Sequence, residues 1–479
     1  MKSLVLSSFI VIFVSGLAAC IANAQSPPRS APDQARSIIP YQPKELTLRI
    51  SQNATIKRPK ISHVRVRSAL GTEQIARLIC HVDDDALIER PSGEYSLVPQ
   101  AETQPTDAKK MSKVSMKDVQ HALTESGIEN FKQKWDKPYL FVYDCSEPFL
   151  EYTQTIMKSM YPGVVKQLRE WELDLERPAV PLVVVIMPDR EAFDKLKPVD
   201  PSVAAYYNMI SNHIILYEDQ ALADAAPEFG LKQAAYTIVH EGVHQLLANT
   251  NVQKRLAEWP MWLSEGVPEY LCPLRVKSKV VKRKTAELPI RDVRWVEAGM
   301  LNDLRMYSLL KMRGGSGDLI KNAATSSNLD ADGYAVAWGM VHHLATNEPD
   351  AFKAYLKEIS KTLPLEPLGE ERDQQLAAVF KKHFDSDFLT MERKIQKHLT
   401  SKKMKKGYKD PIANQTRYLV KMVEKRGKAF LNIAMITTSP AGAREWKEEL
   451  EQQHPKARFY TIICDSQRKA EYEWRKVMN

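Results

Sequence analysis

The chain has 479 residues, of which 44% are apolar and 27% charged, and these fractions are typical of a globular protein rather than of a collagen, a coiled coil or a disordered chain. Its 68 Lys and Arg residues exceed its 59 Asp and Glu residues by nine, a surplus too small to indicate specific nucleic-acid binding. Five cysteines in a chain of this length exclude a scaffold held together by disulfides.

Residues 1–24 have the features of an export signal. Lys2 precedes a long apolar run, and small residues follow it. Two cleavage patterns fit: Ala22 and Ala24 mark a site before Gln25, whereas residues 17–20 resemble a bacterial lipoprotein box in which Cys20 would be acylated. An uncleaved membrane anchor is the third alternative. All three predict a protein exported to the periplasm, the cell envelope or the medium, and two of them tether it to a membrane.

Two further segments precede the main domain. Residues 25–44 are rich in Pro, Ser and Gln, as in a flexible tether. From 45 to 105, apolar and polar residues alternate between Gly and Pro turns, which predicts a small antiparallel β module with strands at 46–50, 64–66, 76–80, 86–88 and 95–98. The four cysteines beyond Cys20 (Cys80, Cys145, Cys272 and Cys464) lack C-x-x-C spacing, so both buried thiols and disulfides remain open.

The segment 115–400 predicts an α+β domain. Its expected order is a strand at 139–143, a helix at 148–171, a strand at 182–187, a helix around 192–196, a hairpin at 204–217 and a helix at 231–248. Helices at 334–346 and 374–399 follow, and the basic stretch 275–294 is interpreted as a surface loop. After a Lys-rich break at 401–409, residues 410–479 predict a small α/β module with a helix from about 416, a strand at 429–434, a helix at 443–453, a strand at 457–463 and a last helix.

A metal-binding motif lies on the helix predicted at 231–248. His240 and His244 are four residues apart, which places them about 40° apart around a helix axis and roughly 6 Å apart along it. Both imidazoles can therefore bind one ion, and Glu241 lies beside them, where its carboxylate can hold an attacking water. This is the H-E-x-x-H arrangement of zinc peptidases.

A third ligand is expected about 20 residues later. If a second helix starts near Met261, it brings Glu265 back over the first, and two His and one carboxylate with an open fourth position are the ligands of a catalytic zinc. Glu269, one turn on, can accept the other ring N–H of His240. Pro268 leaves the position of Glu269 open, because a proline deep in a helix kinks it. One Zn²⁺ per chain is the predicted cofactor.

These motifs resemble those of the gluzincin clan, the thermolysin-like superfamily of metallopeptidases. The resemblance rests on H-E-x-x-H followed by Trp262-Leu-Ser-Glu265-Gly-Val-Pro-Glu269, and covers about half the chain, roughly 134–399. Within the clan, the chain is similar to uncharacterised bacterial peptidase MA-like proteins. Supporting residues are Pro181, Asp189, Arg190, Phe193, Tyr207, Asn212, Ile214, Leu216, Tyr217, Gln245, Tyr334 and Trp338.

The resemblance implies a gluzincin-like core of a mixed sheet and active-site helices. It also implies that the hairpin 204–217 is an edge to which a peptide substrate adds, and that Tyr334 donates a hydrogen bond to the oxyanion, although a packed aromatic stacked on Trp338 fits Tyr334 as well. His342 and His343 are interpreted as helix-surface or core residues. His213 is interpreted as a hairpin residue, and contact with substrate is the less favoured alternative.

The predicted function is that of an exported zinc-dependent peptidase that acts on a peptide or protein. Glu241 would be the catalytic base, with His240, His244 and Glu265 as metal ligands. The alternative is a non-catalytic envelope or surface module that binds peptide or protein and retains zinc as structure. Glu241 favours the enzyme, because a structural site has no use for that carboxylate.

Overall fold

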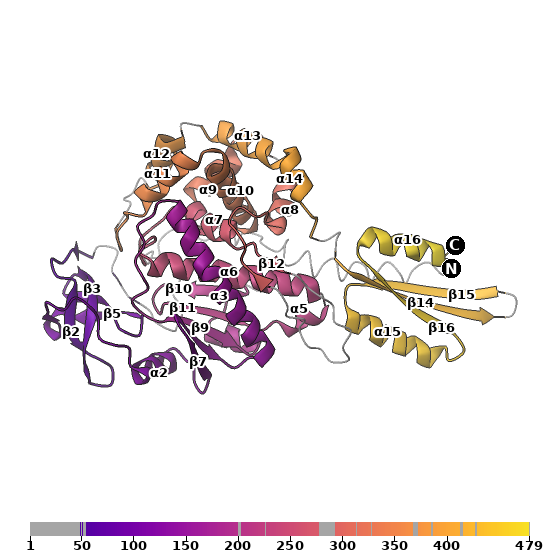
Figure 1. Ribbon diagram of the computed structural model, residues 1–479, viewed down its shortest axis with the longest axis horizontal. Coiled ribbons are helices and arrows are strands. Elements are labelled where there is room, and N and C mark those ends of the chain that lie inside the picture. Colours follow the sequence, from indigo (N-terminus) through magenta and orange to yellow (C-terminus); the bar gives the residue numbers. More distant parts are fainter. Residues whose placement is uncertain are drawn as a thin grey trace, which may run out of the picture.

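The structure is a computed structural model that describes residues 48, 50, 54–199, 203–225, 227–276, 293–312, 314–326, 328–366, 372–384, 387–411, 415–426 and 429–478. The predicted export signal and tether lie outside these residues, as do most of the strand predicted at 46–50 and most of the basic stretch 275–294. Figure 1 shows a central α/β body with a small β sheet at one end and a small α/β unit at the other.

The N-terminal sheet is antiparallel, as predicted. Its order is β5-β4-β3-β2-β6, and β1 also pairs with β3. The strands are β1 (Ile56–Lys57), β2 (His63–Arg67), β3 (Glu73–Val82), β4 (Asp85–Glu89), β5 (Tyr95–Pro99) and β6 (Gln104–Pro105). Burial alternates along β3, so the period-two pattern that predicts a strand also fixes which face packs.

The central sheet is mixed. Its order is β10-β11-β9-β8-β7, in which β8, β9 and β11 are parallel and the two outer strands antiparallel. The strands are β7 (Lys132–Asp136), β8 (Tyr139–Tyr143), β9 (Leu182–Met187), β10 (Ala205–Asn208) and β11 (His213–Tyr217). An α+β fold with a mixed sheet is thus confirmed, and β10 lies at one edge of the sheet.

Helices cover both faces of this sheet. Phe141 and Val184 belong to the core shared with α3 (Glu147–Glu170) and α6 (Pro227–Asn249), whereas Leu140 and Val185 pack with α2 (Met116–Glu125) and α4 (Arg190–Leu196). Alternate residues of one strand thus enter different cores, which explains the continuous apolar runs of β8 and β9. The short helix α5 (Gln220–Ala225) precedes α6.

A helical layer completes the central body (Figure 1). It contains α7 (Met261–Leu271), α8 (Asp303–Lys311), α9 (Asp318–Thr325), α10 (Ala331–Asn347), α11 (Pro349–Ile359), α12 (Arg372–Phe384), α13 (Phe388–Leu399) and α14 (Lys402–Gly407). The described ends of the basic stretch, β12 (Arg275–Val276) and β13 (Val293–Arg294), pair as short antiparallel strands rather than forming a plain loop.

Two helix predictions in this layer are wrong. The single helix expected at 374–399 is two helices, because Asp387 caps a new one by accepting a hydrogen bond from the Thr390 N–H at 2.7 Å. The expected break at 401–409 contains α14, whose start Ser401 caps in the same way. The capping residues thus set helix boundaries that the periodicity and composition of the sequence did not predict.

The C-terminal unit is a three-stranded antiparallel sheet of order β15-β14-β16 with two helices. Its elements are β14 (Arg417–Arg426), β15 (Ala429–Thr437), α15 (Pro440–Gln453), β16 (Arg458–Cys464) and α16 (Gln467–Met478). The helix expected from about 416 is wrong, because that segment is the central strand β14. Leu419, Val420 and Met422 are fully buried there, on both faces of the sheet.

The N-terminal sheet is docked onto the turn between β10 and β11. The Tyr95 N–H donates to the carbonyl of Ile210 at 2.8 Å, and both side chains share a core with Leu256 and Leu365. Arg255, 3% exposed, donates to the carbonyl of Gly93 and pairs with Glu89. The β10–β11 hairpin is therefore held by the central sheet and also by contacts with the N-terminal sheet.

Cys80, Cys145, Cys272 and Cys464 are all free thiols. Of the two readings that their spacing allows, unpaired cysteine is the one found, and three of the four are buried. Among the described residues, no helix is long and apolar enough to cross a membrane.

Candidate metal centre

Two glycines let the helices of the site approach closely. A Cβ on Gly242 of α6 would lie 2.6 Å from the sulfur of Met160 on α3. A Cβ on Gly266 of α7 would lie 2.7 Å from the backbone carbonyl of Ala337 on α10. Heavy atoms cannot pack at these distances, so the crossing at the Ala337 backbone requires glycine, whereas a side chain at position 242 would require the flexible Met160 side chain to move. Gly266 directly follows Glu265, so this close crossing sets where the expected third ligand lies.

The structure brings the three predicted ligands together. The Nε2 atoms of His240 and His244 are 3.1 Å apart, and Oε2 of Glu265 lies 3.2 Å from the first and 3.3 Å from the second. The three side chains are 12–14% exposed, so the triangle is largely buried but reachable from solvent. Within the described residues, this is the group of His, Cys, Asp and Glu side chains whose ligand atoms converge closely enough to hold an ion.

This triangle fits zinc. Ligands about 2.0–2.1 Å from a tetrahedral zinc lie roughly 3.3 Å from one another, close to the three distances found. The lone pairs of two neutral imidazoles and a carboxylate would repel one another at this range unless a proton or a metal ion lay between them. Burial alone would lower the pKa of His240, but hydrogen bonds with Glu265 and Glu269 raise it to about 10. The cluster therefore favours a bound positive charge. A metal ion would displace that proton.

Glu269 orients His240. Its Oε1 lies 3.2 Å from Nδ1 of His240, so an Nδ1–H donated to it leaves Nε2 free for a metal. Arg305 donates to the same oxygen at 2.6 Å and Asn302 to the other at 2.9 Å. Burial would raise the pKa of Glu269, but Arg305 and His240 lower it to about 2, so it stays an acceptor. Pro268 lies inside α7, and the helix continues through it, which places Glu269 as predicted.

Glu241 is buried, 9% exposed, and its carboxylate interacts with all three residues of the triangle. Burial raises the pKa of its carboxyl, and the neighbouring His240 and His244 oppose this shift. A hydrogen bond from the backbone of Tyr207 also opposes it. The outer edge of β10, which contains Tyr207, therefore faces Glu241. A raised pKa brings a carboxylate closer to the range in which it transfers protons efficiently near neutral pH.

Tyr334 faces the triangle rather than Trp338. Asp330 caps α10 by accepting from the Gly333 N–H, which puts Tyr334 in the first helical turn. Its ring centroid lies 6.2 Å from that of His240, whereas the ring of Trp338 lies 5.3 Å from that of His342. The charge of Glu265, followed by burial, raises the pKa of the Tyr334 phenol well above its ordinary value. The hydroxyl therefore remains a hydrogen-bond donor.

Gln245 ties the motif helix to the hairpin. Its fully buried amide donates to the carbonyls of Val183 on β9, at 3.0 Å, and of Asn212 in the hairpin turn, at 2.9 Å. Asn212 also exchanges hydrogen bonds with Asn249 at the end of α6, and accepts one from the Tyr207 hydroxyl at 2.7 Å. These contacts give a physical role to Tyr207, Asn212 and Gln245: they fix β10 against the helix of the metal ligands.

The remaining histidines singled out by the sequence are core residues. His342 and His343 on α10 are buried, and burial followed by the charge of His398 lowers the pKa of each to about 4. His213 is 3% exposed, and burial followed by Arg255 lowers its pKa to about 3. His213 therefore packs as a neutral side chain toward the N-terminal sheet, and Tyr334 is the better placed hydrogen-bond donor.

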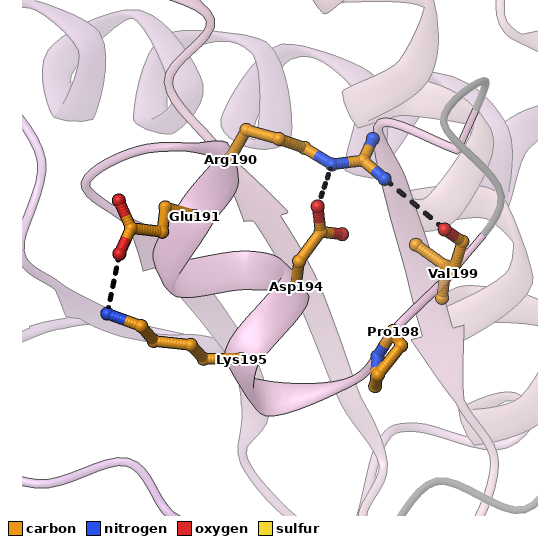
Figure 2. A pocket seen from close by; sticks show the side chains of 6 residues that line it. All are labelled: Arg190, Glu191, Asp194, Lys195, Pro198 and Val199. Atoms are coloured by element: carbon orange, nitrogen blue, oxygen red, sulfur yellow. Dashed lines mark hydrogen bonds and ion pairs between the residues drawn. The ribbon is translucent and has the colours of Figure 1, made fainter.

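A shallow pocket beside α4 lies apart from this centre (Figure 2). Figure 2 shows Arg190 donating to Asp194 and to the carbonyl of Val199, and Lys195 paired with Glu191. Its charges thus pair among themselves, and α4 covers the sheet face opposite to α6.

Residues 234–366 match the model of a family described as protein of unknown function (DUF1570). The matched segment contains all the residues of the candidate centre, from His240 to Tyr334. No curated protein matches the chain. The comparison therefore shows that the part of the chain with the candidate centre is similar to this family, and it assigns no activity.

Sequence reasoning missed Asn302 and Arg305, which hold Glu269. They lie on α8, whose start Asn302 caps, more than 30 positions beyond Glu269. Asn302, as a typical capping residue, could have predicted the start of α8. Nothing local in the sequence indicates that this helix returns to the metal site, because the pairing depends on tertiary packing.

Proposed function

We propose that the protein is an exported zinc-dependent peptidase with a gluzincin-like core. The observation that carries the proposal is the triangle of His240, His244 and Glu265 with the buried carboxylate of Glu241 beside it. A purely structural zinc needs four protein ligands, whereas this set offers three and leaves a side reachable from solvent. Export is inferred from residues 1–24 alone.

Substrate binding is assigned to β10, the strand at the edge of the central sheet. An extended peptide can add to such an edge through backbone hydrogen bonds. The hydrogen bond between the Tyr207 backbone and Glu241 supports this assignment, because Glu241 is the proposed base. Since Gln245, Asn212 and the docked N-terminal sheet hold the hairpin in place, the peptide would meet a preformed template.

Each residue of the centre has a role in the proposed reaction that fits its protonation state. Zinc, when bound, supplies a Lewis acid that polarises a carbonyl and lowers the pKa of water. Glu241 takes the proton of the attacking water and delivers it to the leaving amine. Tyr334, held protonated, donates to the oxygen that becomes negative as the carbonyl carbon turns tetrahedral. Glu269 keeps His240 in the tautomer that presents Nε2 to the metal.

Replacing Tyr334 with Phe is expected to reduce turnover by about 100–1,000-fold, because one oxyanion donor is lost. Zinc content and thermal stability should be unchanged, since the ring and its contacts remain. Tyr307→Phe, on the neighbouring helix α8, is the matched control. A lowered melting temperature with unchanged turnover per folded molecule would instead make Tyr334 a packing residue.

The proposal is tested on the full chain with a peptide library, before and after removal of metal by a chelator. Cleavage should vanish with the metal and return on addition of zinc. Cleavage that persists without metal would refute the zinc mechanism. A chain that carries zinc and cleaves nothing in the library would favour the non-catalytic peptide-binding alternative.

A further inference from the structure

A second cavity lies where the N-terminal sheet meets the central body. It has a volume of about 240 Å³ and is lined by Arg58 after β1, by residues of β3, β4 and β5, by the loop after α3, by the end of α6 and its loop, and by residues 363–364. Its charged lining residues are five basic and two acidic: Arg58, Arg77, Arg177, Lys254 and Arg255 against Glu89 and Glu176. The cavity therefore has an excess of positive charge.

One of the two carboxylates is already paired. Glu89 is buried and forms an ion pair with Arg255, while Arg77 lies 3.4 Å from its other oxygen. Arg255 is further fixed by the carbonyl of Gly93 and by stacking on Tyr95, with its guanidinium 3.7 Å from the ring centre. This buried group neutralises Glu89 and joins the sheet to the central body.

Three cations remain without a carboxylate partner among the residues that the structure describes. Arg58 donates to the carbonyl of Pro364 at 2.6 Å, and Lys254 to the carbonyl of Ser360 at 2.9 Å, both neutral acceptors. Arg177 forms no ion pair within the described ranges, and the carboxylate of Glu176 is hydrogen-bonded to the Asn251 amide. Burial lowers the pKa of Lys254, and the charges of Glu176 and Glu366, neither of which forms an ion pair with it, oppose this shift only in part.

We propose that this cavity binds a small organic or inorganic polyanion, carrying a phosphate or several carboxylates. Guanidinium groups match both of these geometrically, through paired N–H donors. The volume suits a molecule of a few to about a dozen heavy atoms. Because Arg58 and Arg77 come from the N-terminal sheet and Arg177 and Lys254 from the central body, such a ligand would connect the two.

This proposal does not depend on the peptidase proposal. The cavity contains none of the residues of the metal triangle. Loss of zinc or of hydrolysis would leave it untouched, and a cavity that binds no anion would leave the peptidase proposal standing.

The test is calorimetric titration of the full chain at low salt with inorganic phosphate and, separately, with succinate. Saturable binding of at least one of them is expected, with a Kd below about 1 mM. Stronger binding of phosphate would mark a phosphate ligand, and stronger binding of succinate a carboxylate ligand. The expected effect of Arg177→Gln is a roughly 10-fold weaker affinity, the loss of one charge-assisted hydrogen bond.

Lys321→Gln on α9 is the control, because it removes the same charge from an exposed position outside the cavity. It should leave the affinity unchanged. Equal weakening in both variants would mean diffuse attraction to a basic protein and would overturn the proposal. Saturable binding that Arg177→Gln does not affect would place the anion elsewhere, for example at the metal centre, with the same consequence. Failure of both anions to bind below about 1 mM would also overturn it.

Discussion

Glu241→Gln is expected to lower peptide hydrolysis by at least about 100–10,000-fold, the usual contribution of a positioned acid–base group. The amide keeps the shape of the side chain but cannot accept the proton of the attacking water. Zinc should remain bound at one ion per chain, because Glu241 is not one of the three converging ligands. Turnover and metal content measured on the same preparation check both statements.

A matched control is Glu392→Gln. Glu392 is also a buried carboxyl, 2% exposed, but it lies on α13 and accepts from the backbone N–H of Gly315. Any activity lost through general destabilisation should appear in this variant too. Equal hydrolysis by wild type and Glu241→Gln would assign the base to another residue and remove the main reason to regard the centre as catalytic.

Replacing His240 with Ala should release the metal. Removing one of three protein ligands is expected to weaken zinc affinity by more than the 10–100-fold typical of losing a ligand's supporting hydrogen bond. His240 is the informative choice, because it links Glu265 on one side and Glu269 on the other. Metal analysis after dialysis, together with thermal unfolding with and without added zinc, measures the effect.

His343→Ala provides the comparison for this variant, since His343 is a buried histidine outside the triangle. It should keep a full complement of zinc even if its stability falls. If His240→Ala also retained one zinc per chain, the metal would have to be bound elsewhere, and the proposed centre would be wrong.

The two halves of the metal triangle could be predicted because the spacing within each helix is local, whereas their convergence depends on the packing of α7 against α6. The four-residue spacing of His240 and His244 is fixed by the helix, and Glu265 and Glu269 lie one turn apart on the next helix. The uncertainty that Pro268 introduced is resolved by partners that are remote in sequence. Arg305 and Asn302 secure Glu269 from α8, and no local pattern could have identified them.

The error at β14 has the opposite origin. In residues 417–426, apolar side chains at 419, 420, 422 and 423 fit a helix period as well as a strand buried on both faces. Pairing with β15 on one side and β16 on the other selected the strand, and burial of Leu419 and Val420 on opposite faces followed. Such an ambiguity is settled by the neighbouring strands, not by the segment itself.

The docking of the N-terminal sheet has a consequence for how the chain can be divided. Cutting between residues 105 and 115, between the segments predicted as the β module and the main domain, would uncover the apolar side chains of Ile210, Leu256 and Leu365. It would also leave the buried guanidinium of Arg255 without Glu89. Without the sheet, Arg255 would lose its ion pair, and the uncovered apolar patch would promote aggregation. A shortened chain meant to keep the candidate metal centre is therefore expected to need the N-terminal sheet as well.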